Sequence, residues 1–319
     1  MRPSAMRLLS LLLLAALPGL AFAQTGPSTL TLHFSMLPTL DEAAAGHYEG
    51  WAIVGGSPIS TGKFNVNMDG TPVALGGGAV IDEFDAGVDI TAATDIKITL
   101  EPPGDSDDIP SGLVVVAGAV SGLTADLTAA IPNLDMLTNM TTGAFFLATP
   151  SDNPDNPDNN NQGIWYLTMP GPDPGFQNLP DIGPNWNYEG WVVDVSGAPM
   201  PYTTGKFSMA SGADSDEAGC MGGGPPFPGQ DFVDFQCGPT LNLDSGDFVT
   251  VLTIEPVPDN SAMPFLFKPL AGPIPTDGVG MNAIPMTNQV ADTFPTGQAL
   301  LAGTTATESV SLSAVKALY

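Results

Sequence analysis

Short apolar runs alternate with turn-forming clusters along the whole of this 319-residue chain. The runs are rich in Val, Ile, Thr, Phe and Trp, and clusters of Gly, Pro, Asn and Asp separate them every few residues. With 37 glycines and 32 prolines, the chain leaves almost no stretch long enough for a helix. The pattern predicts an all-β fold of the sandwich or barrel kind.

The pattern occurs twice, in the same order. Two landmarks of the first copy are Tyr48-Glu49-Gly50-Trp51 and Thr61-Gly62-Lys63-Phe64, which return as Tyr188-Glu189-Gly190-Trp191 and Thr204-Gly205-Lys206-Phe207. Two later landmarks are Thr99-Leu100-Glu101-Pro102 and Thr142-Gly143, which return as Thr253-Ile254-Glu255-Pro256 and Thr296-Gly297. An ordered repeat whose spacing grows along the chain indicates an internal duplication with loops that have lengthened.

We predict six strands in each copy. They cover residues 30–34, 48–54, 61–67, 95–101, 112–119 and 144–149 in the first copy, and 163–169, 188–195, 204–209, 248–255, 265–270 and 298–302 in the second. The polar run 151–162 is rich in Asp, Asn and Pro and predicts a solvated linker. The expected organisation is two tandem β-sandwich modules, 28–150 and 163–304, followed by a C-terminal extension, 305–319.

The start of the chain has the features of a signal peptide. Arg2 and Arg7 precede an apolar run from Leu8 to Leu20, and Ala21-Phe22-Ala23 follows as a cleavage site. We therefore expect residues 1–23 to be removed and the mature protein to be periplasmic or extracellular. No later stretch reaches the roughly 20 apolar residues of a membrane span, so we expect no direct membrane insertion.

The charge balance excludes some partners. Cleavage would leave five lysines against 34 acidic residues, a net charge of −29. Nucleic acid requires a basic surface, so it is not an expected partner. Such an acidic surface suits solubility, a salty medium or divalent cations.

Both cysteines lie in the region where the second copy is longer. Phe207 and Glu255 are 48 residues apart, whereas Phe64 and Glu101 are 37 apart. An isolated pair in an exported chain predicts a disulfide between Cys220 and Cys237, worth roughly 3 kcal/mol. A metal pair is the weaker alternative, because no histidine lies nearby to complete a site.

The order Tyr-x-x-Trp, hairpin, Thr-Gly-x-Phe and a strand ending in Glu-Pro resembles the C-terminal, extracytoplasmic domain of anti-sigma-K factors. Both copies carry it, at Tyr48–Pro102 and Tyr188–Pro256. The resemblance implies a β-sandwich outside the cytoplasm. The cytoplasmic sigma-binding segment and transmembrane helix of that family have no counterpart here, so the resemblance gives anti-sigma activity no physical basis.

Two of the five lysines occupy equivalent positions, which predicts cross-strand ion pairs Glu49–Lys63 and Glu189–Lys206 on the hairpins. A binding role for these pairs is the alternative. Tyr48 and Trp51 are three residues apart, as are Tyr188 and Trp191, so the two rings of each copy cannot share one face of a strand. We expect one ring of each copy to enter the core.

The sequence predicts no catalytic residues and no metal redox site. His33 and His47 are the only histidines, and the copper sites of sandwich proteins need His, Cys and Met together. Nucleophile elbows, phosphate-binding glycine loops and His-Glu-x-x-His helices are absent from the sequence.

Three acidic clusters are candidate calcium ligands, against the alternative of solvated acidic loops. They are Asp152, Asp155 and Asp158; Asp105, Asp107 and Asp108; and Asp214, Asp216 and Glu217. The expected function is an exported, non-enzymatic binding or scaffold module of the cell envelope, with a protein or glycan partner. A regulatory or sensing ectodomain related to anti-sigma factors is the alternative, and a glycosidase using carboxylates alone is the weaker one.

Overall fold

The computed structural model describes residues 25–151, 160–217, 219, 224–233, 239–259 and 261–305. Strands hold 45% of the residues and helices 7%, which confirms the predicted all-β sandwich class. The signal peptide, most of the 151–162 run and both cysteines lie outside the described residues, so export, the linker and the disulfide stay predictions.

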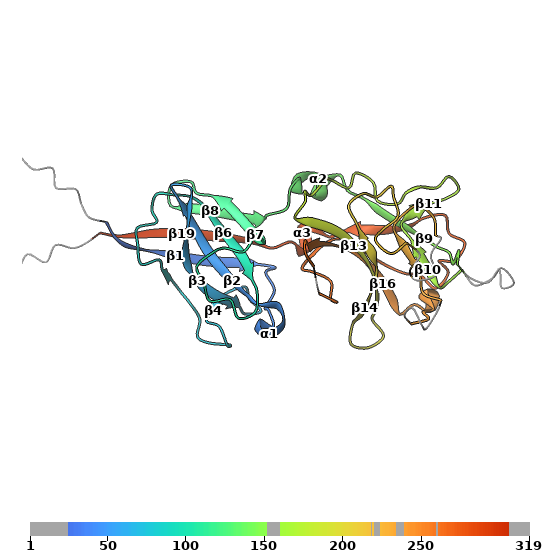
Figure 1. The fold of residues 1–319 in the computed structure, drawn as a ribbon, viewed down its shortest axis with the longest axis horizontal. Helices are drawn as coiled ribbons and strands as arrows, with labels where there is room; N and C mark the ends of the chain where they lie inside the picture. Colours follow the sequence, from blue (N-terminus) through green and yellow to red (C-terminus); the bar gives the residue numbers. More distant parts are fainter. Residues whose placement is uncertain are drawn as a thin grey trace, which may run out of the picture.

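Module 1 is built on a nine-stranded antiparallel sheet with the order β4-β3-β2-β6-β7-β8-β19-β1-β5 (Figure 1). Its strands are β1 (Thr25–Ser35), β2 (His47–Val54), β3 (Ser57–Val66), β4 (Pro72–Val73), β5 (Phe84–Asp85), β6 (Ala93–Glu101), β7 (Val114–Ala119), β8 (Thr124–Ala129) and β19 (Thr296–Thr305). A short helix, α1 (Glu42–Ala45), precedes β2 and is capped by Asp41.

Module 2 is built on an eight-stranded antiparallel sheet with the order β14-β13-β16-β17-β18-β9-β10-β15. Its strands are β9 (Gly143–Leu147), β10 (Gly163–Trp165), β13 (Trp186–Asp194), β14 (Met200–Phe207), β15 (Gly229–Asp231), β16 (Phe248–Pro256), β17 (Phe267–Pro273) and β18 (Ile284–Asn288). The remaining elements are a small pair, β11 (Leu167–Thr168) with β12 (Asp173–Pro174), the helices α2 (Leu134–Asn139) and α3 (Val290–Thr293), and the 3-10 turn η2 (Leu243–Ser245).

Apart from β4, the two sheets correspond strand for strand. When both orders are read from left to right, starting at β3 and β14, each strand of module 1 has a counterpart in module 2. The first four pairs are β3 with β14, β2 with β13, β6 with β16 and β7 with β17, and the last pair is β5 with β15. The register is also shared, because Tyr48 lies opposite Phe64 as Tyr188 lies opposite Phe207. Two sheets with the same order and register are what the duplicated landmarks predict.

The structure differs from the predicted modules 28–150 and 163–304 at two equivalent strands. β9 follows β8 in the chain but pairs with β18 and β10 of module 2. β19 follows β18 but pairs with β8 and β1 of module 1. The copies have therefore exchanged their last strands, and the chain runs from module 1 into module 2 and back again.

The two crossing segments meet between the modules, where α2 and α3 lie in contact (Figure 1). Asn288 ties them together, since its Nδ2 donates to the carbonyl oxygens of Leu137 (2.9 Å) and Thr141 (3.1 Å). At the far end of module 1, the first residue of β1 pairs with the last residue of β19. The described chain thus enters and leaves at one end of the molecule, and module 2 lies at the other (Figure 1).

Each sheet curls over so that its two edges approach. In module 1, Phe64 of β3 packs on Phe84 of β5 with ring centroids 5.3 Å apart. In module 2, Tyr202 of β14 meets Phe232, just after β15, at 6.3 Å. The apolar faces turned inward form a core, as in a sandwich.

The sequence prediction missed the very short strands β4, β5, β12 and β15, and one longer strand in each copy, β8 and β18. β8 alternates exposed and buried residues but is short and has no aromatic residue. β18 contains Pro285, and a proline within a run argues against a strand. Among the described residues, no helix has the length and apolar character that crossing a bilayer requires.

Candidate functional site

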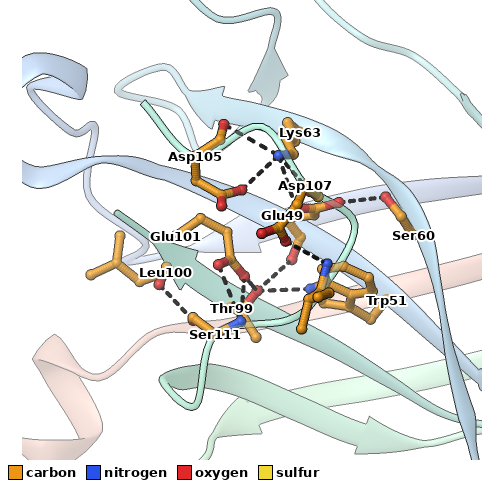
Figure 2. A network of polar contacts seen from close by, with 11 residues as sticks. Glu49, Trp51, Ser60, Lys63, Thr99, Leu100, Glu101, Asp105, Asp107 and Ser111 are labelled. Carbon is orange, nitrogen blue, oxygen red and sulfur yellow. Dashed lines mark hydrogen bonds and ion pairs between the residues drawn. The ribbon is translucent and has the colours of Figure 1, made fainter. Parts of the chain in front are cut away.

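A polar cluster lies on the outer face of β2, β3 and β6. Side chains alternate along a strand, so Tyr48 and Ala52 enter the core while Glu49 and Trp51 point to the opposite face. Loop 102–113 folds over that face, and both Glu49 and Trp51 are buried there. We call Glu49, Trp51, Lys63, Thr99 and Glu101 cluster 1 (Figure 2).

A chain of hydrogen bonds links the cluster to its covering loop. Trp51 Nε1 donates to Thr99 Oγ1 (2.8 Å), and the Thr99 hydroxyl donates to Glu101. The two carboxylate oxygens of Glu101 accept the backbone N–H of Ser111 at 3.0 and 3.1 Å. The buried carboxylate of Glu101 therefore holds the end of the loop against the sheet (Figure 2).

Lys63 holds the middle of the same loop. Its Nζ contacts Asp105 Oδ2 (2.6 Å) and donates to the carbonyl oxygens of Asp105 (3.3 Å) and Asp107 (2.8 Å). Glu49 Oε2 lies 3.7 Å from the same nitrogen, directly across the β2–β3 pair. Glu49 Oε1 accepts a 2.5 Å hydrogen bond from Ser60. The predicted pair is thus part of a larger network, with a carboxylate that is shielded from solvent.

Module 2 repeats this arrangement with Glu189, Trp191, Lys206, Thr253 and Glu255, which we call cluster 2. Trp191 Nε1 donates to Thr253 Oγ1 at 2.8 Å, and Thr253 donates to Glu255. Glu255 Oε1 accepts the backbone N–H of Phe265 (2.9 Å). Glu189 accepts from Thr203 (2.5 Å) and lies 3.9 Å from Lys206 Nζ, which is 2.9 Å from Asp259 Oδ2.

The glycine between Glu and Trp has the same role in both copies. A Cβ at Gly50 would lie 2.5 Å from Thr61 Oγ1, and one at Gly190 would lie 2.2 Å from Thr204 Oγ1. The strand pairing is irregular at the same place in both hairpins. The glycine therefore lets the two strands approach closely beneath the cluster.

Burial controls the protonation of both clusters. Burial raises the pKa of Glu49, although the Ser60 hydrogen bond and the Lys63 charge oppose it. Burial raises the pKa of Glu189 further, to about 7, and it also raises the pKa of Glu255. Burial would lower the pKa of Lys63 and Lys206, but their carboxylate partners raise it overall. Both lysines are therefore cations at neutral pH, and Glu189 exists in both forms.

The two clusters differ in what lies above them. Cluster 2 opens into a cavity of about 460 Å³, which we call the module 2 cavity. Glu189, Trp191, Tyr202 and Lys206 line it from β13 and β14. Residues 216 and 230–232, from the segment that lengthens the second copy, also line it, as do Ser261 and Ala262 from the loop after β16.

Cluster 1 is more enclosed. The Lys63 side chain is 20% exposed, whereas that of Lys206 is 32% exposed. Three cavities of module 1 lie away from cluster 1 and are lined by residues of β1, β8 and β19 or by the turns at 36–39 and 67–70. The same polar scaffold is thus covered in one module and open to a cavity in the other.

Each cluster brings together groups of the kind that bind metals. Donor atoms of His47, Glu49 and Asp105 lie within 4.8 Å of one another, and so do those of Glu189, Glu255 and Asp259. In each group, a lysine ammonium already lies among the carboxylates. The lysine takes the place among these donors that a metal ion would need, so we describe the two groups as lysine sites.

The candidate calcium ligands have other contacts. Asp105 pairs with Lys63, and Asp107 Oδ1 accepts the backbone N–H of Ile109. Asp214 accepts the backbone N–H of Gly229 (2.7 Å), and burial raises its pKa to about 7. Asp108, Asp216 and Glu217 are exposed, and Asp152, Asp155 and Asp158 lie outside the described residues. Calcium binding stays a prediction.

The histidines do not come together. His33 is exposed on β1. His47 is buried at the start of β2, opposite Glu101, where Asn187 and Glu255 face each other in the second copy. Burial lowers the pKa of His47, which favours the neutral ring.

Thr99, Glu101, Thr253 and Glu255 were not predicted as site residues from the sequence. The signal was present, because the sequence Thr-x-Glu-Pro occurs in both copies, at the ends of β6 and β16. Residues two apart on a strand share a face, so a repeated Thr-x-Glu beside a repeated Glu-x-Trp predicts a common cluster. No repeated motif indicated the cavity lining from residues 216 and 230–232, because the segment that contains them lengthens the second copy alone.

Comparison with known proteins gives little guidance. No family model and no curated protein matches the chain. One solved structure, the paired C2 domains of extended synaptotagmin 2, is similar over 94% of this chain and 99% of its own length, at 10% identity and a TM-score of 0.22. A likeness at that score supports no inference about function.

Proposed function

We propose that this chain is an exported, non-enzymatic binding protein in which module 1 is a scaffold and module 2 carries the ligand site. The observation that supports the proposal is the difference between two otherwise equivalent clusters. Only the second has been extended by a longer segment, and that segment walls a cavity large enough for a small molecule. Changes in loops around a constant scaffold are how binding sites commonly arise.

The arrangement of the termini fits presentation of such a site. The described chain begins and ends at the outer end of module 1, while the module 2 cavity lies in the other module (Figure 1). A chain held at either terminus would therefore keep module 2 away from its point of attachment. Export itself rests on the signal-peptide pattern of residues 1–23 and is part of the proposal.

A carboxylate-based glycosidase is supported less well. Glycosidases of that kind need two carboxyl groups facing the sugar. Glu189 faces the cavity, but Glu255 is fully buried beneath it and holds Thr253 and the backbone of Phe265. Across the cavity, Asp231 accepts hydrogen bonds from Trp165 and Ser151. Both groups act as structural acceptors, so the exposed Asp216 is the remaining carboxyl group among the described lining residues that could pair with Glu189.

The resemblance to anti-sigma-K domains remains a prediction about ancestry and compartment. A regulatory role would make the cavity a sensor site instead of a capture site. An adjacent sigma factor gene would favour that role.

A binding screen tests the proposal. The mature protein is titrated with a panel of amines, amino acids, sugars, nucleosides and short peptides, and binding is read by calorimetry and thermal shift. The control is Ala262→Trp, which places a large side chain at an exposed position of the cavity lining and leaves the core unchanged.

We expect at least one class of compound to bind the wild-type protein and to lose binding in Ala262→Trp. If no class binds, or if the variant binds equally well, the cavity is not a ligand site. Turnover of a glycoside panel, abolished by Glu189→Gln, would instead favour the enzyme.

A further inference from the structure

We propose that the module 2 cavity binds a small organic cation with an ammonium group, held by Glu189 and Gln230 against aromatic walls. The proposal rests on the proposed function and adds the chemical class of the ligand. Three properties of the cavity support it: buried acceptors without hydrogen bonds, more carboxyl groups than ammonium groups, and aromatic side chains.

The cavity has buried acceptors that lack donors. Glu189 is 3% exposed and Gln230 is 8% exposed, and both line the cavity. Gln230 Oε1 and Glu189 Oε2 accept no hydrogen bond from the described residues, although Glu189 Oε2 has an ion pair with Lys206 at 3.9 Å. A buried acceptor without a donor is costly, so a ligand that fits must supply N–H or O–H groups.

The position of Gln230 is constrained. A Cβ at Gly219 would lie 2.2 Å from Gln230 Nε2, so the amide nitrogen packs against that glycine. Gly219 has φ of +77°, a conformation that favours glycine.

The cavity has more negative than positive charge. Glu189, Asp216 and Asp231 contribute carboxyl groups, and Lys206 contributes the one ammonium among the described lining residues. Lys206 is engaged by Asp259, at 2.9 Å from its Oδ2 and 3.4 Å from its carbonyl oxygen. Asp259, outside the lining, is thus the nearer partner of Lys206, which also lies 3.9 Å from Glu189 Oε2. An ammonium ligand would share the Glu189 carboxylate with Lys206, and the net charge of the whole chain attracts cations.

Aromatic rings supply the remaining contacts. Trp191, Tyr202 and Phe232 all line the cavity, and Tyr202 meets Phe232 edge-on. The faces of aromatic rings carry negative potential and attract ammonium groups. Carboxyl, amide and aromatic groups around one cavity suit an ammonium attached to an apolar body better than they suit a neutral polyol.

Proton binding at Glu189 should then affect affinity. Glu189 is faced by Thr203 and Lys206 of β14, by Glu255 of β16 and by Asp259 of the following loop. Burial raises its pKa to about 7, so the anionic form grows as the pH rises through neutrality. An ammonium ligand should bind more tightly at pH 8 than at pH 6, and a neutral ligand of the same shape should not.

The test compares two probes of one shape and different charge. Calorimetry on the mature protein measures 2-phenylethylammonium, 2-phenylethanol and methyl glucoside at pH 6, 7 and 8. Glu189→Gln removes the charge at constant shape. Glu49→Gln is the matched control, because it makes the same change in cluster 1. Asp216→Asn is a second cavity variant at an exposed position, usable if Glu189→Gln does not fold.

We expect the ammonium to bind at least tenfold more tightly than the alcohol, with a further gain from pH 6 to pH 8. Glu189→Gln should weaken it at least tenfold, Asp216→Asn should weaken it less, and Glu49→Gln should leave it unchanged. If the alcohol or the glucoside binds as tightly as the ammonium, the ligand class is wrong while the binding function stands. If none of the three probes binds, while other compounds of the panel bind and Ala262→Trp abolishes their binding, the ligand class is again wrong and the binding function stands. If nothing in either experiment binds, both proposals fail.

Discussion

The two polar clusters differ mainly in the loops around them. In both, a tryptophan donates a hydrogen bond to a threonine, and the threonine donates to a glutamate. That glutamate accepts a backbone N–H from the loop that follows β6 in module 1 and β16 in module 2. In module 1, Lys63 has three contacts with loop residues 105 and 107. In module 2, Lys206 contacts Asp259 alone in its loop and is more exposed.

This difference suggests how the duplication was used. The side chains that fix the loop to the sheet were kept in both copies, because each carries a buried polar group that needs its partners. The segment between β14 and β16 is longer than its counterpart in the first copy, and residues from it line the cavity. The side chains common to both clusters are those that the fold requires, and the cavity wall is what the second copy has added.

The largest expected effect comes from the exchanged strand. Deleting residues 296–319 removes β19, which pairs with both β1 and β8, so module 1 should lose its fold while module 2 keeps all eight strands. In NMR spectra, the indole N–H signal of Trp51 should collapse to its unfolded position, and those of Trp165, Trp186 and Trp191 should keep theirs. A tandem arrangement with independent modules predicts the reverse, with damage confined to module 2.

The next largest effect should be equal in the two modules. Trp51 and Trp191 are 1% and 2% exposed, and each donates a buried hydrogen bond at 2.8 Å. Trp51→Ala and Trp191→Ala should each lower the free energy of unfolding by about 3–5 kcal/mol, as measured by urea titration. A much smaller loss for Trp191→Ala would mean that cluster 2 has given up its structural role.

Much of this scaffold could be predicted from the sequence. The alternation around Tyr-Glu-Gly-Trp placed tyrosine and tryptophan on opposite faces, and the structure has Tyr48 and Tyr188 in the core with Trp51 and Trp191 on the other face. The duplicated landmarks predicted two sheets of one kind. These features were accessible because they depend on local periodicity.

The exchange of β9 and β19 could not be predicted in that way. Both strands begin at the same landmark, Thr-Gly, and either could pair with β8 or with β18. Which sheet each strand joins is decided by the paths of residues 130–142 and 289–295, where no motif is repeated. The cavity could not be predicted from the sequence either, because it depends on side chains from three separate segments.

A smaller, matched effect is expected for the core tyrosines. The Tyr48 hydroxyl donates to the carbonyl oxygen of Pro38 (2.9 Å), and the Tyr188 hydroxyl donates to that of Pro180 (2.8 Å). Replacing either tyrosine by phenylalanine should cost about 1 kcal/mol, because the hydrogen bond from the hydroxyl to the carbonyl is lost. Equal losses in thermal unfolding would show that the core is used alike in both copies, and a loss in one copy alone would contradict this.

The smallest effect concerns pH and should distinguish the clusters. The folded state raises the pKa of Glu189 from 4.5 to about 7, so over that range it holds a proton that the unfolded chain releases. The resulting stabilisation is complete below about pH 4.5, declines as the pH rises and is gone above about pH 7. Glu189→Gln cannot ionise, so its stability should fall less steeply than that of the wild type between pH 5 and pH 7.5.

Urea titrations at half-unit intervals measure these slopes. Glu49→Gln should flatten the slope less, because burial raises the pKa of Glu49 less far than it raises the pKa of Glu189. Equal slopes for Glu189→Gln and the wild type would mean that Glu189 is ionised throughout.

The central claim, that equivalent clusters have become a scaffold in one module and a binding site in the other, is tested most directly by the two indole N–H signals. Trp51 and Trp191 have the same hydrogen-bond partner type, but only Trp191 lines the module 2 cavity. The signals are assigned with Trp51→Phe and Trp191→Phe and followed during titration with 2-phenylethylammonium. We predict that the Trp191 signal moves in a saturable way while the Trp51 signal stays in place. Equal shifts of both signals, or a bound probe that moves neither, would contradict the account.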